Sequence, residues 1–126
     1  MNNNPVGWFE IYVQDMERAK RFYESVFQTK LERLDSPAGM PVELWSFPMM
    51  KGQMGASGAL VKMADGPSGG NAVLVYFSCA DCTVEAARAA PAGGQLIREK
   101  MSIGPYGFIA LIRDTEGNMI GLHSMQ

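Results

Sequence analysis

Apolar and polar residues alternate along several segments of the chain, as they do in β-strands that bury one face. The segment 5–13 shows the pattern first. Its odd positions carry an apolar set and its even positions a mixed aromatic and acidic set: Phe9, Ile11 and Val13 against Trp8, Glu10 and Tyr12. Because successive side chains of a strand point to opposite faces, we expect each set to occupy its own side of a sheet.

A different periodicity follows this strand. Met16, Ala19, Tyr23 and Val26 recur at the spacing of one helix face, with charged residues between them. Asp15 stands just before them and can accept a hydrogen bond from the first helical turn as an N-cap. The pattern predicts an amphipathic helix of about three turns that begins after Asp15.

Strand-like alternation then returns three times before a stretch of turn residues. The predicted strands are 29–34, 40–47 and 58–63. Residues 64–70 consist mainly of Gly, Pro, Ser and Asp, which favour turns and mark a boundary between modules.

The second half of the chain repeats this order of elements. We predict a strand at 72–79, a helix capped by Asp81 and ending near residue 90, and three further strands at 95–101, 106–113 and 119–124. The apolar stripe of this helix would carry Cys82, Ala86 and Ala89.

The two halves are offset by a fixed number of residues. Asp15 superimposes on Asp81, a shift of 81 − 15 = 66, and the same shift places Ile11 on Phe77. We infer an internal duplication of a βαβββ unit, with modules at about 5–64 and 71–124 of one α+β domain that covers residues 1–126.

The amino-acid composition and net charge argue against some classes of binding partner. Hydrophobic residues make up 47% of the 126 residues and charged residues 19%, which suits a folded domain with a real core. Eleven basic against thirteen acidic residues give a net charge of −2, so no strong positive field favours nucleic acid or an anionic membrane. No apolar run approaches the length of a membrane span, and the first residues do not read as a secretory signal. We therefore expect no nucleic-acid or membrane partner and a cytoplasmic location.

Two segments at opposite ends of the chain resemble one family. Residues 8–23, WFEIYVQDMERAKRFY, and residues 108–123, FIALIRDTEGNMIGLH, are similar to the opening and the end of the glyoxalase, bleomycin resistance protein and extradiol dioxygenase superfamily, also called vicinal oxygen chelate proteins. The resemblance implies two βαβββ modules that form a curved mixed sheet with a central cleft and helices outside. It also implies a small organic ligand, lyase or isomerase chemistry in active members, and a homodimer.

Metal-dependent members of that family hold a divalent ion at positions that this sequence fills differently. The matching positions are Trp8, Leu74 and Gly121, and the segment 52–64, expected to supply one further ligand, contains no Asp, Glu or His. Indole, isobutyl and hydrogen have no lone pair to donate to such a cation. We expect no metal and no cofactor, so lactoylglutathione lyase activity does not follow from the resemblance.

Two titratable residues are candidates for catalysis. Glu10 lies on the face assigned to the cleft, either as a general base or ligand acceptor whose pKa is raised by apolar neighbours, or as a solvated or Arg-paired structural carboxylate. His123 shares a strand face with Gly121 and could form a proton-transferring pair with Glu10, or could simply be a surface histidine near the chain end.

The expected ligand-binding set adds aromatic residues to these two: Trp8, Glu10, Tyr12, Trp45, Tyr76 and His123. Trp45 stands near an apolar group, Phe47, Met49, Met50 and Met54, which either borders the cleft as a flexible lip or fills a core or a dimer interface. Cys79 and Cys82 spell C-x-x-C, but both fit apolar faces, so we interpret them as packing residues rather than a redox pair.

Three functions remain open at this point. The first is a glyoxalase-like protein without the usual metal ligands that binds a small, partly apolar molecule in an aromatic cleft. The second is a metal-independent isomerase or lyase in which Glu10 or His123 moves a proton. The third is a non-catalytic interaction or regulatory module.

Overall fold

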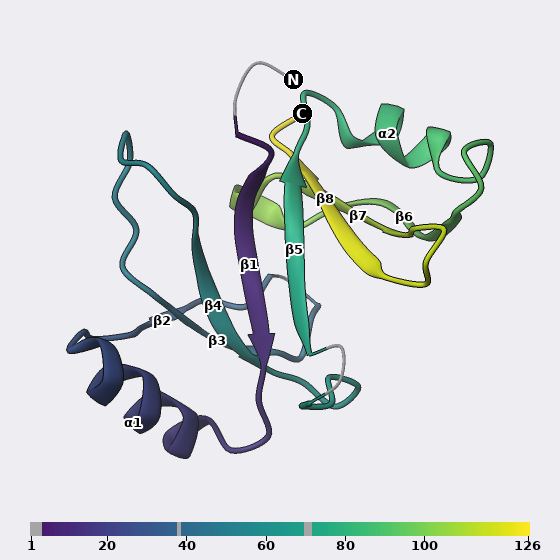
Figure 1. Cartoon of the computed structure of the whole chain (residues 1–126). Helices are drawn as coiled ribbons and strands as arrows, with labels where there is room; N and C mark the ends of the chain where they lie inside the picture. Colours follow the sequence, from purple (N-terminus) through teal and green to yellow (C-terminus); the bar gives the residue numbers. More distant parts are fainter. Residues whose placement is uncertain (1–3, 38, 70–71) are drawn as a thin grey trace. The chain divides into compact units, whose positions relative to one another are not determined.

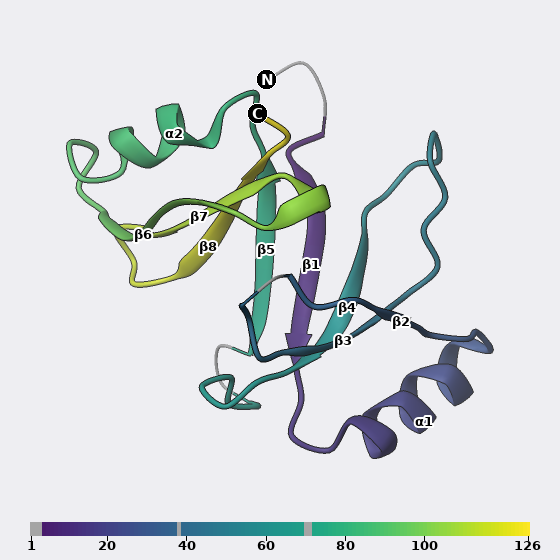
Figure 2. The ribbon, with the colours of Figure 1, turned by 180° about the vertical axis from the view of Figure 1, so that it is seen from behind.

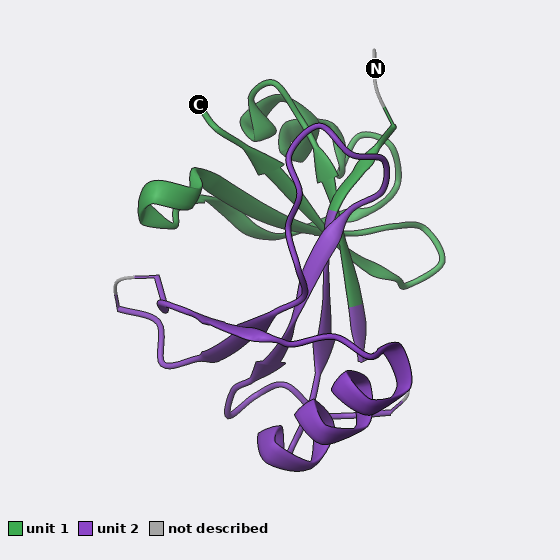
Figure 3. Cartoon of the chain, turned by 90° about the vertical axis from the view of Figure 1, so that its left-hand side faces the viewer, with its two compact units in different colours: residues 1–7, 74–126 green, residues 8–73 purple. Residues whose placement is uncertain are grey.

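The computed structural model describes residues 4–37, 39–69 and 72–126, which fall into two compact units (Figure 3). The first, here called the N-terminal unit, comprises the described part of residues 8–73. The second, the C-terminal unit, comprises residues 74–126 together with the described residues up to Gly7. The start of the chain joins the second unit because Ser78 N donates a hydrogen bond to Pro5 O at 2.8 Å.

The N-terminal unit contains one helix and four strands (Figure 1). The elements are β1 (Val6–Tyr12), which begins in the other unit, α1 (Met16–Phe27), β2 (Glu32–Leu34), β3 (Glu43–Ser46) and β4 (Ser57–Lys62). The strand order is β2-β3-β4-β1, with β1 and β4 parallel and the other pairs antiparallel.

Helix α1 begins as the sequence predicts. The Asp15 side chain caps it by accepting a hydrogen bond from Arg18 N at 3.0 Å. Its inner face packs on a core of four buried residues, Val13, Met16, Leu31 and Leu60, with Ala19 and Tyr23 alongside. Val26 does not join this core, contrary to our expectation: its side chain is 55% exposed. At 3.6 residues per turn, the spacing of ten residues from Met16 places Val26 at the margin of the buried stripe.

The C-terminal unit has the same succession of elements (Figure 2). They are β5 (Val73–Ser78), α2 (Cys82–Arg88), β6 (Gln95–Ser102), the short 3₁₀ helix η1 (Gly104–Tyr106), β7 (Phe108–Arg113) and β8 (Met119–Ser124). The order is β5-β8-β7-β6, with β5 and β8 parallel and the remaining pairs antiparallel. Tyr106 was expected in a strand but lies in η1, because Gly107 follows with a φ of 99° and the strand starts only after it.

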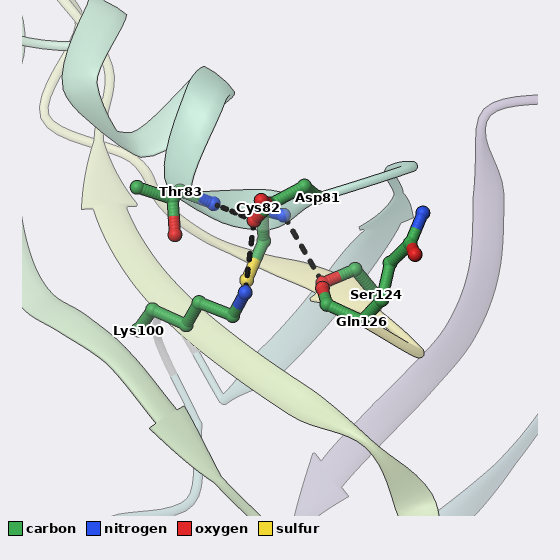
Figure 4. A network of polar contacts seen from close by, with 6 residues as sticks. All are labelled: Asp81, Cys82, Thr83, Lys100, Ser124 and Gln126. Carbon is green, nitrogen blue, oxygen red and sulfur yellow. Dashed lines mark hydrogen bonds and ion pairs between the residues drawn. The ribbon is translucent and has the colours of Figure 1, made fainter.

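A polar network fixes the start of α2 (Figure 4). Asp81 accepts hydrogen bonds from Thr83 N at 3.0 Å and from Lys100 Nζ at 2.9 Å. Ser124 Oγ, almost fully buried, accepts from Cys82 N at 3.0 Å and donates to Gln126 O at 2.8 Å. The C-terminal end of β8 thereby satisfies a backbone donor that the helix start would otherwise leave buried and unpaired.

The predicted α+β class and the two βαβββ successions are confirmed, as is the mixture of parallel and antiparallel strands in each unit. The buried stripe of α2 contains Cys82, Ala86 and Ala89, as predicted. The central cleft expected from the resemblance would need both units, so it stays a prediction. Neither α1 nor α2 has the length and apolar character needed to cross a bilayer.

Candidate functional site

Strand β1 presents two chemically different faces in the N-terminal unit. Ile11 and Val13 pack on the core beneath α1. Trp8 and Tyr12 pack on the other side of the same strands, against three buried residues: Leu44, Ala59 and Val61. The alternation predicted from the sequence is therefore confirmed, and Trp8, Glu10 and Tyr12 lie on the face opposite α1, here called the open face of the N-terminal unit.

Glu10 is held in place by its two neighbours on this face. Trp8 Nε1 donates to Glu10 Oε2 at 3.3 Å, and Tyr12 Oη donates to Glu10 Oε1 at 3.0 Å. Burial, and then the adjacent Glu10 carboxylate, raise the pKa of Tyr12 far above its usual value, so its hydroxyl stays protonated and continues to donate. The arrangement is a carboxylate fixed between an indole and a phenol.

Trp45 does not belong to this face, which corrects our grouping of it with Trp8. It pairs with Leu60 in the β3–β4 register and packs against the core beneath α1. Lys20 Nζ lies 3.4 Å from the centre of the Trp45 ring, and Trp45 Nε1 donates to Glu43 Oε2 at 2.9 Å. The error arose because the loop ahead of β3 made the parity of that strand uncertain from sequence alone.

Tyr76 lies on the corresponding face of the C-terminal unit and is only 7% exposed. It pairs with Gly121 in the parallel β5–β8 register, and a Cβ atom built on Gly121 would overlap the Tyr76 ring. The ring therefore fills the space that any side chain at position 121 would need. The sequence showed both residues but gave no signal that one covers the other.

His123 is partly exposed near the end of β8. Its Nε2 atom lies 2.5 Å from Tyr106 O in η1. Since a carbonyl oxygen can only accept, Nε2 carries the hydrogen, and Nδ1 of the neutral ring then carries the lone pair. Tyr106 was not among the expected site residues; the Gly-Pro-Tyr-Gly turn at 104–107 marked a turn but not its contact with a histidine.

Glu10 and His123 belong to different units, and the hydrogen bonds given above join each of them to residues of its own unit. Their predicted pairing therefore stays a prediction. The structure joins Glu10 with Trp8 and Tyr12, and His123 with the backbone of Tyr106.

The residues at the family's metal positions do not fit a divalent ion. Trp8 donates its indole N–H to Glu10, Leu74 is buried and apolar, and Gly121 lies under the Tyr76 ring. Within the ranges that the structure describes, no group of three or more His, Cys, Asp and Glu side chains is placed to hold a metal.

The two cysteines are set up for packing rather than for reaction. Cys82 is fully buried in the core of the C-terminal unit, and Cys79 packs against the same core. Burial, followed by the nearby Glu85 carboxylate, raises the pKa of Cys79 to about 11, so its thiol is protonated at neutral pH.

Two surface hollows border α1 in the N-terminal unit. One has a volume of about 600 Å³ and is lined by Arg21, Phe22, Glu24, Ser25 and Val26. The other, of about 310 Å³, is lined by eight residues, among them Asp15, Arg18 and Ser68. Neither hollow includes Trp8, Glu10 or Tyr12, so the candidate site rests on its chemistry rather than on its depth.

A comparison with models of known families identifies the family to which this chain belongs. The model of the Glyoxalase/Bleomycin resistance protein/Dioxygenase superfamily matches residues 6–122. The chain belongs to this superfamily. The match spans both units, in agreement with the duplicated βαβββ pattern.

Two curated relatives are longer than this chain. "Putative glyoxylase CFP32" of Mycobacterium bovis and its Mycobacterium tuberculosis counterpart are each 27% identical over 118 residues, which cover 92% of this chain and 44% of the relative. The chain thus spans less than half the length of the curated relatives it matches.

Solved structures share the fold at lower identity. A hypothetical protein from Bacillus halodurans aligns with a TM-score of 0.71 at 13% identity, over 96% of this chain and 94% of the other. Methylmalonyl-CoA epimerase from M. tuberculosis aligns with a TM-score of 0.70 at 16% identity, over 97% and 88%. A Streptomyces coelicolor methylmalonyl-CoA epimerase in complex with 2-nitronate-propionyl-CoA gives 0.68 at 16% identity, over 96% and 94%. These likenesses establish the fold alone.

Proposed function

We propose that this superfamily member binds a small, partly apolar organic molecule on the open face of its N-terminal unit, with Trp8, Glu10 and Tyr12 as the contacts. The observation that carries the proposal is the Glu10 carboxylate held between Trp8 Nε1 and Tyr12 Oη, on the face opposite α1. A fixed polar group among aromatic side chains is what a small-molecule site usually presents.

The wider context supports a small organic ligand. Solved relatives of the fold include epimerases in complex with CoA esters. The proposal itself rests on the side chains of Trp8, Glu10 and Tyr12 in this chain, because the likeness to those relatives establishes the fold alone.

Tyr76 and His123 remain predicted contacts of the ligand. Homodimer formation and a cytoplasmic location also remain predictions.

A titration of ¹⁵N-labelled protein with a library of aromatic fragments tests the proposal. We expect hits that shift the Trp8 indole N–H signal and the amides of β1, and a loss of affinity in Trp8→Ala. Trp45→Phe is the matched control, because Trp45 lies on the face beneath α1 and its removal should leave fragment binding unchanged. Hits confined to other surfaces, or a Trp8→Ala protein that binds as well as the wild type, would refute the proposal.

A metal-independent isomerase or lyase is the second candidate, and one observation favours it. Tyr106 O fixes the hydrogen of His123 on Nε2, which leaves Nδ1 to accept a proton from a bound molecule. His123→Asn keeps a polar atom near the Nδ1 position and His123→Gln one near the Nε2 position, but neither can take up a proton at neutral pH. If a turnover is found, both variants should abolish it, whereas an active His123→Gln protein would remove the histidine from the mechanism.

A further inference from the structure

In the C-terminal unit, α2 packs against one side of β6, β7 and β8 (Figure 2). Ala110 and Ile112 of β7 belong to the core beneath this helix. The alternate residues Leu111 and Arg113 therefore lie on the opposite face, because successive side chains of a strand point to opposite sides. Arg98 of β6 pairs with Leu111 in the antiparallel register, and paired residues share a face. We call the face defined by Arg98, Leu111 and Arg113 the basic face.

The two arginines of the basic face both border Leu111. Arg98 lies opposite Leu111, and Arg113 lies two residues beyond Leu111 on β7, so the arginines are diagonal neighbours across the two strands. Diagonal neighbours of this kind lie roughly 7–8 Å apart, a separation that long side chains can bridge. The basic face therefore places two guanidinium groups beside one half-buried apolar side chain.

The positive charge of these arginines is not taken up by carboxylates of the chain. Neither Arg98 nor Arg113 forms an ion pair within the part of the chain that the structure describes. Arg98 Nη1 donates to Met101 Sδ at 3.2 Å. A thioether is a weak acceptor and a guanidinium group carries five N–H donors, so this bond leaves most of the Arg98 donors for another acceptor.

Few acidic residues lie in this sheet. Strands β5, β7 and β8 contain no Asp or Glu, and β6 contains only Glu99. Glu99 falls in an irregular stretch of β6, where the register shifts after Arg98. Asp114 follows Arg113, but its oxygens accept three hydrogen bonds within their own turn, from Glu116 N and from the backbone and side-chain nitrogens of Asn118.

The N-terminal unit carries the opposite charge on its corresponding face. Its edge strand β2 has Glu32 there, paired with Ser46, which in turn pairs with Ala59 of the open face. Edge strand β6 of the C-terminal unit has Arg98 instead. Because the same succession of strands forms with an acidic residue on this face, the fold itself does not require the arginines.

We infer that the basic face binds an organic oxyanion, a carboxylate or a phosphate monoester, carried on an apolar body. The guanidinium groups of Arg98 and Arg113 would donate paired hydrogen bonds to the oxyanion, and the apolar body would lie against Leu111. An anion between the two arginines also offsets the repulsion between their like charges. This site shares no residue with the proposed site on β1, so each can fail without the other.

Three probes that share a naphthalene ring test the inference: 2-naphthoate, 2-naphthyl phosphate and the neutral 2-naphthylmethanol. At pH 7 the carboxylate is ionised, and a phosphate monoester carries a charge of about −1.5 to −2. The readout is the set of β7 amide signals and the Nε–H signals of Arg98 and Arg113 in ¹⁵N-labelled protein. We expect an anion to bind at least about ten-fold more tightly than the alcohol, and the tighter anion identifies the kind of oxyanion.

Variants that remove one charge each locate the contacts. Arg98→Gln and Arg113→Gln should each weaken the preferred anion by about five- to ten-fold and leave the alcohol unchanged. Arg88→Gln is the matched control, because it removes the same charge from α2, on the other side of the sheet, and should change the affinity by less than about two-fold. Arg98→Lys keeps the charge without the planar fork and should retain only part of the affinity.

Added salt supplies a readout in the wild type, because it should weaken the anions and not the alcohol. The inference is wrong if the alcohol binds the basic face as tightly as both anions, or if anion binding survives the double variant Arg98→Gln, Arg113→Gln without loss. Anions that shift only signals outside β6 and β7 would overturn it as well. None of these results touches the proposed site at Trp8, which is tested by the signals of β1.

Discussion

The two units share one architecture but carry opposite chemistry on the faces turned away from their helices. The shift of 66 residues aligns Glu10 with Tyr76. In the N-terminal unit the position holds a carboxylate that accepts two side-chain hydrogen bonds, and in the C-terminal unit it holds a nearly buried ring packed over Gly121. The first arrangement fixes a carboxylate between an indole and a phenol, and the second packs a ring over a glycine.

The helix sides of the two units keep a common design. Asp15 and Asp81 both cap their helices with a side-chain oxygen, and the strand before each places an apolar residue, Ile11 or Phe77, against the helix core. The comparison teaches that the two units keep the same succession of elements while the side chains on their outer faces differ.

The largest effect is expected where the C-terminal face is closed. Gly121→Ala places a Cβ atom in the Tyr76 ring, and overpacking of this kind lowers the free energy of unfolding by about 1–3 kcal/mol. Urea unfolding measures it. In a Tyr76→Ala background the cost of Gly121→Ala should largely vanish, and an equal cost in both backgrounds would show that the ring does not close this face.

A smaller effect is expected at the buried serine of the C-terminal unit. Ser124→Ala leaves Cys82 N without its acceptor and should lower the free energy of unfolding by about 1–2 kcal/mol. Ser68→Ala is the counterpart in the N-terminal unit: it removes an exposed hydrogen bond to Tyr12 O and should cost no more than about 0.5 kcal/mol. Equal costs in urea unfolding would contradict the difference in burial.

The smallest effect is expected in the pH dependence of stability, to which the two helix-capping aspartates, Asp15 and Asp81, should contribute unequally. Hydrogen bonding to Lys100 and to Thr83 N lowers the pKa of Asp81, and the hydrogen bond from Arg18 N lowers the pKa of Asp15. A lowered folded-state pKa stabilises the protein above the unfolded value of about 3.9, and that contribution is lost as the pH falls through the folded-state pKa. Stability should therefore decline below about pH 4.

Asparagine variants identify which cap is responsible, because asparagine retains a capping oxygen but does not titrate in this range. Asp81→Asn should reduce the acid-dependent part of stability more than Asp15→Asn, since only Asp81 also pairs with Lys100. Thermal unfolding from pH 7 to pH 3 provides the measurement. A larger change in Asp15→Asn would show that the Lys100 pair has no such role.

Local patterns predicted most of the scaffold because they depend on near neighbours. Alternation assigned the two faces of β1, and the aspartates before the helices identified both N-caps. Predictions failed where distant residues decide the outcome. Trp45 lies beneath α1 because of the register of β3 with β4, and Tyr106 lies in η1 because Gly107 ends a turn.

The sequence predicted which residues form the candidate site but not the hydrogen bonds between them. The sequence placed Trp8, Glu10 and Tyr12 on one face, yet gave no sign that both neighbours donate to the carboxylate. Such bonds depend on side-chain rotamers as well as on strand parity. The tautomer of His123 was likewise beyond prediction, because the Tyr106 carbonyl comes from a separate element.

A crystal structure of the protein soaked with an aromatic fragment that shifts the Trp8 indole N–H signal tests the proposed binding site most directly. We expect density for this probe against the Trp8 ring, beside Glu10 and Tyr12. Density for the probe against Tyr76 and His123, or in the hollow beside Phe22 and Val26, with the face of Trp8 and Glu10 empty, would contradict it.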